Sequence, residues 1–219
     1  MNSISSLNYT ITRLEKPKST TPAPTPDLAW YKLNGTILDY CKDNTVGKAG
    51  AKTTSEQYST YLSKSCFLFD GGPYATGNFI SLPAMSRPNT LTFSCFINIT
   101  IINAFARIFD YGGSFRLHMK NSTSLWFNDK YKINYKSSFQ NTWKHIGFTV
   151  DGNTLTPYEN GLPIVAIMMT SDLSPTASVG YIAHSMGGDP NTKGMFSDFR
   201  IYGRVLSSSE IMAIYQNNV

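Results

Sequence analysis

Apolar and polar residues alternate along much of this chain, most regularly over residues 91–100. Leu91 and every second residue as far as Ile99 are apolar, and the residues between them are mostly Thr, Ser or Asn. Successive side chains on a strand point to opposite faces of a sheet, so this pattern predicts a strand with one buried face. Residues 143–150 repeat the pattern, with Ile146, Phe148 and Val150 on the buried side.

Two tight turns follow this second strand. Asp151-Gly152 and Asn160-Gly161 flank a short extended run over residues 154–158. Asp-Gly and Asn-Gly accept the positive φ angles of hairpin turns. Residues 143–161 therefore predict an antiparallel meander.

Similar runs bounded by Gly, Pro or Asn predict the other strands. They cover residues 28–33, 36–40, 66–70, 78–82, 106–111, 114–119, 125–127, 131–135, 163–168, 179–183 and 196–202. The polar residues 42–58 predict a long surface loop, and residues 185–194 predict a Gly-rich loop. Many short strands with regular turns predict an all-β fold, a two-sheet antiparallel sandwich of the jelly-roll type.

The period changes near the C-terminus, where one short helix is predicted. Ser207 is placed to cap its first turn, with Glu210 completing a capping box and Leu206 and Ile211 forming a hydrophobic staple. The residues that share one face of this helix are Ile211, Ile214 and Tyr215. We therefore expect the helix to pack on the sandwich as a lid.

The first 27 residues differ from the domain predicted for residues 28–219. Residues 16–26 alternate Pro with small polar residues, which predicts an extended, semi-rigid linker. Before it, Leu7, Tyr9 and Ile11 alternate with polar residues. This pattern predicts an extended N-terminal arm that adds as a strand to the sheet edge of a partner, and the alternative is a disordered tail.

Composition supports the β prediction and limits the partners. Aromatic residues make up 13% of the chain and charged residues 15%, which is typical of pleated sheets. The formal net charge is +5, but the 19 Lys and Arg residues are scattered. Because phosphate binding needs a concentrated basic patch, we expect no nucleic acid as a partner.

Neither a secretory signal nor a membrane span is predicted, because no segment is apolar over the required length. The three cysteines, Cys41, Cys66 and Cys95, are an odd number at wide spacing. This spacing favours buried free thiols over a disulfide scaffold or a zinc site.

Several motifs in order resemble the laminin-G-like members of the concanavalin A-like lectin and glucanase superfamily. They are residues 67–71 with 79–83, residues 91–94, residues 143–161, and residues 194–202 leading into 204–215. The resemblance extends over about residues 28–219, and it implies the same jelly-roll sandwich.

That superfamily contains glycoside hydrolases, which use two carboxylates about 5 Å apart in the retaining mechanism. This chain has four Glu residues, and none has an acidic residue two positions away. Glu159 falls in the predicted Asn-Gly turn. The three histidines, His118, His145 and His184, lie on separate predicted strands without a nucleophile elbow or metal-ligand spacing. We therefore expect no catalytic residues and no enzyme activity, and we interpret His145 as structural.

The resemblance also implies that a calcium ion is possible at the rim of the sandwich. Candidate ligands are Asp70, Asp110, Asp151 and Asp189. The alternative is that these residues are in turns for conformational reasons. We expect no other cofactor.

Three aromatic residues are candidate ligand-binding residues, because sugar rings stack on aromatic side chains. They are Tyr111, Trp126 and Tyr131. The alternative is that they fill the core.

These patterns together predict a non-catalytic interaction module. The main hypothesis is a structural subunit of a larger assembly such as a virus particle, as a minor capsid or surface protein that contacts other subunits through its arm. The alternative is a free, extracellular carbohydrate-binding lectin.

Overall fold

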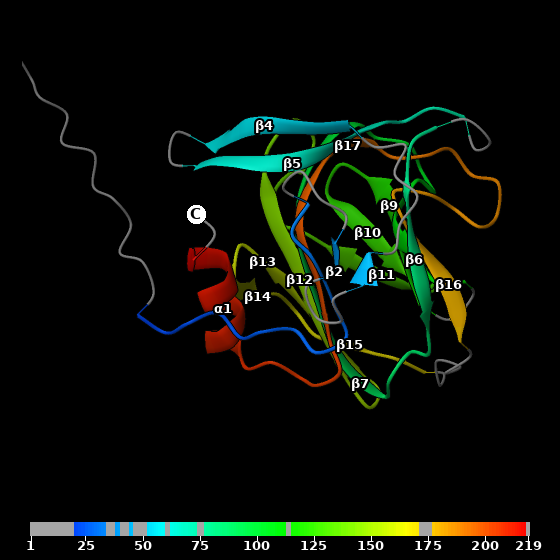
Figure 1. Cartoon of the computed structure of the whole chain (residues 1–219). Helices are drawn as coiled ribbons and strands as arrows, with labels where there is room; N and C mark the ends of the chain where they lie inside the picture. The colour runs from blue at the N-terminus through cyan, green and yellow to red at the C-terminus, as the bar shows by residue number, and fades with distance from the viewer. Residues whose placement is uncertain are drawn as a thin grey trace, which may run out of the picture.

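The computed structural model describes residues 20–33, 38–39, 44–45, 52–59, 62–73, 77–112, 115–170 and 177–217. They form two antiparallel sheets packed face to face and one C-terminal helix (Figure 1). The predicted jelly-roll sandwich is therefore confirmed. The N-terminal arm with Leu7, Tyr9 and Ile11 lies outside the described residues.

The larger sheet has the order β14-β13-β12-β7-β17-β1-β2-β3, with β5 also paired to β17, β4 to β5 and β15 to β13. Its strands are β1 (Ala29–Tyr31), β2 (Leu38–Asp39), β3 (Asn44–Thr45), β4 (Lys52–Ser59), β5 (Leu62–Asp70), β7 (Thr90–Ile101), β12 (Lys144–Asp151), β13 (Thr154–Glu159), β14 (Leu162–Pro163), β15 (Ile167–Met168) and β17 (Lys193–Tyr202). The other sheet has the order β11-β10-β9-β8-β16-β6. Its strands are β6 (Ile80–Met85), β8 (Arg107–Asp110), β9 (Arg116–Asn121), β10 (Ser124–Phe127), β11 (Tyr131–Asn134) and β16 (Ser178–Ile182).

The core lies between the two sheets. Phe93 of β7 is at its centre, with its ring 4.8 Å from Phe109 of the six-stranded sheet and 5.3 Å from both Phe148 and Phe199. All four rings are fully buried. The inward residues of β7 and β12 are the apolar ones that the alternating pattern predicted.

The outer face of the larger sheet is buried as well, contrary to the expectation that β7 and β12 have one solvent-exposed face. Ser94, Phe96 and His145 are on this face, and each is less than 4% exposed. The helix α1 (Ser208–Asn217) lies on this side, on the left in Figure 1, and residues 20–28 run beside it. A second apolar cluster joins Tyr202 and residues of α1, and Ala23 packs against it.

The helix begins as predicted. The backbone N–H of Ser207 donates to Glu210 Oε2 at 2.8 Å, and the Glu210 N–H donates to Ser207 Oγ at 3.3 Å. Leu206 and Ile211 belong to the same apolar cluster. Both the capping box and the packing of the helix on the sandwich are therefore confirmed.

The predicted meander is also present as β12, β13 and β14. Asn160 and Gly161 have φ angles of 50° and 79°, and Gly152 has a φ of 53°. At Gly161 a Cβ would lie 2.9 Å from Met212 Sδ and 3.1 Å from Tyr215 Cβ. This turn therefore needs Gly both for its backbone and for its close approach to α1.

Three predictions of local structure are wrong. The strand predicted for residues 163–168 is interrupted at residues 164–166, which separate β14 from β15. Residues 42–58 were expected to form a loop, but they contain β3 and most of β4, which pairs with β5 in a hairpin at the top of Figure 1. The polar sequence of β4 gave no apolar pattern to detect. Strand β6 also continues past Pro83, which is tolerated because β6 is an edge strand with a register shift opposite this point.

The last residues of the predicted linker contact the domain. The Thr21 carbonyl accepts a hydrogen bond from Asn217 Nδ2 at 3.0 Å, and the Pro24 carbonyl accepts one from the Tyr202 hydroxyl at 2.9 Å. Asp27 Oδ1 accepts the Gly203 N–H at 2.8 Å. The chain therefore enters the domain along the side that carries α1.

Two of the three cysteines lie within the described residues. Cys66 and Cys95 are buried free thiols, as predicted, and burial raises the pKa of the Cys95 thiol. Cys41 lies outside the described residues.

Within the described part of the chain, no helix is long and apolar enough to cross a membrane.

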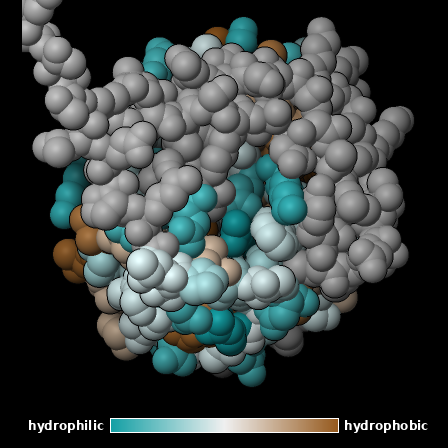
Figure 2. All heavy atoms as spheres, turned by 60° about the vertical axis from the view of Figure 1, so that its left-hand side comes forward, coloured by the Kyte–Doolittle hydropathy of each residue, from teal (hydrophilic) through white to brown (hydrophobic). Residues whose placement is uncertain are grey.

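Figure 2 shows the described residues on the side of α1 by hydropathy. Figure 2 turns this side forward, and its coloured residues are largely hydrophilic or neutral, with hydrophobic ones gathered mainly along the left edge.

Candidate functional site

The outer side of the six-stranded sheet, which we call the open face, carries a group of cationic and aromatic side chains. On β9, Leu117 and Met119 point into the core. Because side chains alternate along a strand, the residues between and beside them point outward. The open-face residues of β8 to β11 that concern us are Arg107, Arg116, His118, Lys120, Trp126 and Lys132.

Three aromatic rings form a row on the open face. The His118 ring lies 5.5 Å from the Phe105 ring and 6.3 Å from the Trp126 ring. Lys120 Nζ lies 5.7 Å from the Phe105 centroid and 5.5 Å from the Trp126 centroid. His118 is buried, whereas Phe105 is 48% exposed. The row therefore presents apolar ring surface and one ammonium group to solvent.

Phe105 has a strained backbone. Its φ is +73°, in the left-handed region, which costs a non-Gly residue about 1–2 kcal/mol. Arg107 Nη1 donates to the Phe105 carbonyl at 2.9 Å, and the Phe105 N–H donates to the Met119 carbonyl at 2.9 Å. Backbone strain held by neighbouring groups is typical of functional sites.

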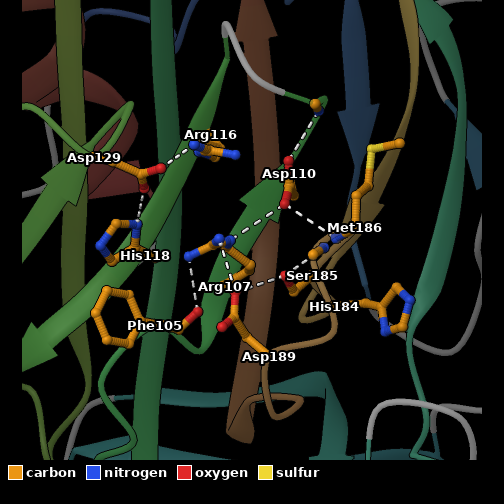
Figure 3. A network of polar contacts seen from close by, with 12 residues as sticks. Phe105, Arg107, Asp110, Arg116, His118, Asp129, His184, Ser185, Met186 and Asp189 are labelled. Atoms are coloured by element: carbon orange, nitrogen blue, oxygen red, sulfur yellow. Dashed lines mark hydrogen bonds and ion pairs between the residues drawn. The ribbon is translucent and has the colours of Figure 1, made fainter.

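Arg107 connects the sheet to the Gly-rich loop of residues 184–191 (Figure 3). Its Nε lies 3.2 Å from Asp110 Oδ2, and its Nη2 lies 2.9 Å from Asp189 Oδ2. The Ser185 hydroxyl also donates to Asp189 at 2.9 Å, and the Met186 N–H donates to Asp110 at 3.2 Å. The loop is therefore fixed against one side of the open face.

Asp129 lies on the other side of the face, where it forms an ion pair with Arg116. His118 Nδ1 lies 2.9 Å from Asp129 Oδ1, but the geometry is not that of a hydrogen bond. Burial, and then the charges of Arg107 and Arg116, lower the pKa of His118 to about 4. His118 is therefore neutral at pH 7, and its contact with Asp129 is not an ion pair.

Four buried polar atoms on the open face have no hydrogen-bond partner among the described residues. They are Arg116 Nε, His118 Nδ1, Trp126 Nε1 and Asp129 Oδ1. Native proteins rarely leave buried polar atoms unpaired, so a group of them requires an explanation. Because these atoms are covered, a ligand would bond to them only after a local shift of their side chains.

Of the three predicted ligand-binding residues, Trp126 alone lies on the open face. Tyr111 is 3% exposed in the core, where its ring fills the space above Gly180 that a Cβ would occupy. Tyr131 is 7% exposed, and its hydroxyl accepts the Thr170 N–H at 3.1 Å. A stacking role for Tyr111 or Tyr131 does not fit these positions, because their rings already pack in the core.

The four candidate calcium ligands do not come together. Asp70 accepts hydrogen bonds from the backbone at Gly72 and Asn78, and Asp151 is exposed at the end of β12. Asp110 and Asp189 are close to each other, with the guanidinium of Arg107 bound to both. Among the described residues, no group of three or more His, Cys, Asp or Glu is placed to hold a metal ion.

Glu159 has a structural role at the end of β13 rather than in the turn where the sequence placed it. It accepts hydrogen bonds from Lys144 Nζ at 2.7 Å, the Lys136 N–H at 2.6 Å and the Ser137 hydroxyl at 2.9 Å. Burial alone would raise the pKa of Glu159, but these hydrogen bonds outweigh it and lower the pKa. The carboxylate is therefore held ionised as part of the framework.

His145 is also structural, as expected. It is fully buried, and its Nε2 lies 2.8 Å from the Ser94 hydroxyl under α1. The pKa of His145 is lowered to about 3, chiefly by burial.

Sequence reasoning missed most of the open-face residues. Arg116, His118 and Lys120 alternate with Leu117 and Met119, so the period-2 pattern could have placed all three on one outer face. The pairing of Arg107 with Asp189 had no sequence signal, because 82 residues separate them (189 − 107).

Comparisons with known proteins agree with the fold. Residues 70–212 match a family model described as the concanavalin A-like lectin/glucanases superfamily. No curated protein matches the sequence significantly.

Many solved structures are similar in fold. One is domain 4 of AbnA, an extracellular arabinanase of Geobacillus stearothermophilus, in complex with arabinotriose, with a TM-score of 0.67, 17% identity, and coverage of 85% of this chain and 97% of that one. The binding domain of Paraclostridial Mosquitocidal Protein 1 has a TM-score of 0.64 and 15% identity over 85% of this chain and 51% of that one. The receptor-binding domain of botulinum neurotoxin D has a TM-score of 0.63 and 15% identity over 87% of this chain and 52% of that one. This chain therefore spans about half the length of the two toxin domains.

Proposed function

We propose that this chain, which belongs to the concanavalin A-like lectin/glucanases superfamily, is a non-catalytic module that binds a saccharide on its open face. The observation that carries the proposal is the row of Phe105, His118 and Trp126 with its strained, half-exposed Phe105. A sugar ring presents an apolar C–H surface that packs on an aromatic face, and its hydroxyls bond to nearby polar groups.

The polar groups around the row suit hydroxyl recognition. Trp126 Nε1 has no hydrogen-bond partner among the described residues, and His118 Nδ1 and Asp129 Oδ1 contact each other at 2.9 Å without hydrogen-bond geometry. A saccharide hydroxyl both donates and accepts hydrogen bonds, so it can satisfy groups of either kind.

The similar solved structures support a binding role. The arabinanase domain was determined with arabinotriose, and the toxin domains are named as binding or receptor-binding domains. Arabinotriose is the ligand of the arabinanase domain. For this chain, the similarity suggests only the class of ligand, a saccharide.

The described carboxylates favour a binding module over a glycosidase. Glu159 is bound by Lys144, and Glu210 is bound by Arg204. Asp110 and Asp189 are both bound by the guanidinium of Arg107. A retaining glycosidase needs one carboxylate free to attack and one that gives up a proton.

Glycan-array binding followed by calorimetry would test the saccharide site. We expect Trp126→Ala to weaken binding of the best glycan about tenfold or more, because it removes the stacking surface. Trp143→Ala, which removes a partly buried aromatic ring packed near Cys66 on the larger sheet, is the matched control. Thermal unfolding checks that both variants fold. The proposal fails if the array shows no glycan binding, or if Trp126→Ala binds as the wild type does.

We also propose, as the larger context, that the module is a subunit of an assembly such as a virus particle. The supporting observation is that residues 21–27 are fixed beside α1, so the preceding segment starts at a defined point on the surface. Deleting residues 1–19 should abolish incorporation into the assembly and leave glycan binding by the domain unchanged. Native mass measurement of the particle checks this, and unchanged incorporation would contradict it.

A further inference from the structure

We propose that the saccharide bound on the open face carries a single acidic group, a carboxylate or a sulfate, and that Lys120 and Lys132 bind it. This inference rests on the proposed function and names the class of its ligand.

The two lysines flank Trp126 on neighbouring strands. Lys132 of β11 is directly opposite Trp126 of β10, and His118 of β9 is opposite it on the other side. Lys120 is two residues beyond His118, so it points to the same face and reaches over the Trp126 ring. Both lysines are exposed. A ligand stacked on Trp126 would therefore have an ammonium group on each side.

The charge of the two lysines is not neutralised within the described part of the chain. Arg107 is paired with Asp110 and Asp189, and Arg116 is paired with Asp129. Lys120 contacts the Phe105 and Trp126 rings, and neither lysine forms an ion pair with a described residue. The open face therefore has two cations available to a ligand.

A bound sugar would remove water from these cations. Lys120 Nζ lies 5.5 Å from the Trp126 centroid, so a sugar stacked on that ring displaces solvent from the ammonium group. A desolvated charge without a partner is costly, whereas an ammonium–carboxylate hydrogen bond is about twice as strong as a neutral one. An acidic group on the sugar therefore offsets the desolvation cost of the ammonium group with a charge-assisted hydrogen bond.

The field at His118 supports this sign of charge. After burial, the largest influences on the pKa of His118 are Arg107 and Arg116, which lower it, and Lys120 lowers it as well. Asp189 acts in the opposite direction and is weaker than the two arginines. The charged groups of the face agree with this sign, because the four cations Arg107, Arg116, Lys120 and Lys132 outnumber the three carboxylates of Asp110, Asp129 and Asp189.

A polyanion such as single-stranded nucleic acid is less suited to this face. Lysines beside aromatic rings are also found in proteins that bind single strands. Here, however, Asp110, Asp129 and Asp189 lie along the same face, and a chain of phosphates would run past them. One acidic group placed between Lys120 and Lys132 avoids these carboxylates.

The test uses the full chain on an array that pairs each acidic glycan with its neutral parent. Sialylated and glucuronate-terminated glycans supply the carboxylate, and sulfated ones supply the sulfate. Sialyllactose with lactose and sulfated lactose with lactose are two such sets. We expect the best acidic member to bind about tenfold more tightly than its neutral parent. Lys120→Gln and Lys132→Gln should each remove most of this preference, measured as the ratio of the two dissociation constants within each acidic and neutral pair.

Lys193→Gln is the matched control, since it removes one charge from β17, a strand of the larger sheet. It should keep the full acidic preference. The inference is overturned if neutral parents bind as tightly as acidic glycans, or if the double variant Lys120→Gln with Lys132→Gln keeps the preference. It is also overturned if a thymidine oligonucleotide binds more tightly than any acidic glycan. Neutral binding that needs Trp126 but shows no acidic preference would overturn this inference alone. Absence of binding to every glycan would overturn the proposed function as well.

Discussion

The two outer faces of this sandwich have similar residues and different surroundings. Each has a buried histidine, His145 on the larger sheet and His118 on the smaller one, and each has a buried Arg–Asp pair. On the larger sheet, α1 and residues 20–28 lie over these groups. On the open face, the loop of residues 184–191 is fixed at one side, and the rings of Phe105 and Trp126 reach solvent.

This difference separates framework from site. Under α1, the Arg200 guanidinium binds Asp198 at 2.8 Å, stacks 4.7 Å from the Trp30 ring and contacts the Tyr202 hydroxyl. His145 Nδ1 is the exception there, since it has no partner among the described residues. On the open face, Arg116 Nε and Trp126 Nε1 have no partner among the described residues, and His118 Nδ1 and Asp129 Oδ1 contact each other without hydrogen-bond geometry. The strained residue Phe105 lies on the same face. Polar groups alone therefore do not mark a site, whereas polar groups left unsatisfied beside exposed rings do.

The largest effect should come from breaking the framework under α1. Arg200→Met leaves Asp198 buried without its cation, which typically costs about 3–5 kcal/mol of unfolding free energy. Urea unfolding measures the loss. Arg204→Met is the matched control, because its ion pair with Glu210 is exposed and such pairs contribute about 0–1 kcal/mol. Equal losses in the two variants would show that the ion pair of Arg200 is no better secluded from solvent than that of Arg204.

Lowering the pH should distinguish the contributions of His118 and His145 to the free energy of unfolding. Because burial lowers the pKa of His145 to about 3 and that of His118 to about 4, both remain neutral in the folded protein well below pH 6.5. In the unfolded chain each histidine takes up a proton near pH 6.5. The unfolded state then binds more protons than the folded state. The free energy of unfolding therefore falls as the pH is lowered, by about 1.4 kcal/mol per pH unit for each histidine.

The two contributions end at different pH values. The contribution of His118 is complete at about pH 4, where the folded state also takes up the proton, and that of His145 continues to about pH 3. His118→Gln and His145→Gln should therefore flatten the stability curve equally between pH 6 and pH 4, and only His145→Gln should flatten it further below pH 4. Urea unfolding at several pH values measures these slopes. A larger flattening from His118→Gln would mean that the open face is the better packed of the two.

The helix cap gives a smaller effect on the same side of the molecule. Ser207→Ala removes the hydroxyl that accepts the Glu210 N–H, and loss of an N-cap costs about 1 kcal/mol. Thermal unfolding should show a lower Tm, with glycan binding unchanged because the helix is on the opposite side of the sandwich from the open face. Ser207→Asp keeps an acceptor at the cap and should keep the stability. Loss of glycan binding in Ser207→Ala would contradict this and show that the helix and the open face are energetically coupled.

Patterns of local origin predicted most of the fold. Alternation gave β7 and β12, Asn160-Gly161 gave the turn into β14, and Ser207 with Glu210 gave the start of the helix. These features depend on residues close together in sequence. The polar strand β4 escaped detection, because it is defined by backbone pairing with β5 rather than by an apolar pattern.

The candidate site was predicted in part, because it depends on distant contacts. An alternating strand shows which face a residue is on but not what covers that face, so the burial of Ser94 and His145 could not be foreseen. Tyr111 and Trp126 looked equally suitable for stacking in the sequence. Gly180, 69 residues beyond Tyr111 (180 − 111), leaves the space in the core that the Tyr111 ring fills.

The smallest change in stability, and the sharpest test of the open face, comes from Phe105. Phe105→Gly removes the cost of a left-handed side-chain residue, about 1–2 kcal/mol, and adds the unfolded-state entropy of Gly, about 0.5–1 kcal/mol. The variant should therefore be as stable as the wild type or up to about 1.5 kcal/mol more stable in urea unfolding. Its affinity for the glycan that the array identifies should fall, because one ring of the row is gone.

Phe105→Ala separates the ring from the backbone. This variant also lacks the ring but keeps a Cβ at a φ of +73°, so it should bind as weakly as Phe105→Gly and be less stable by about 1 kcal/mol. Equal stability of the two variants would mean that the backbone at Phe105 is not strained. Unchanged affinity in both would remove Phe105 from the site and leave Trp126 as its aromatic surface. A gain in stability with a loss of binding in Phe105→Gly would show that the strain is maintained for the ligand, since the fold does not need it.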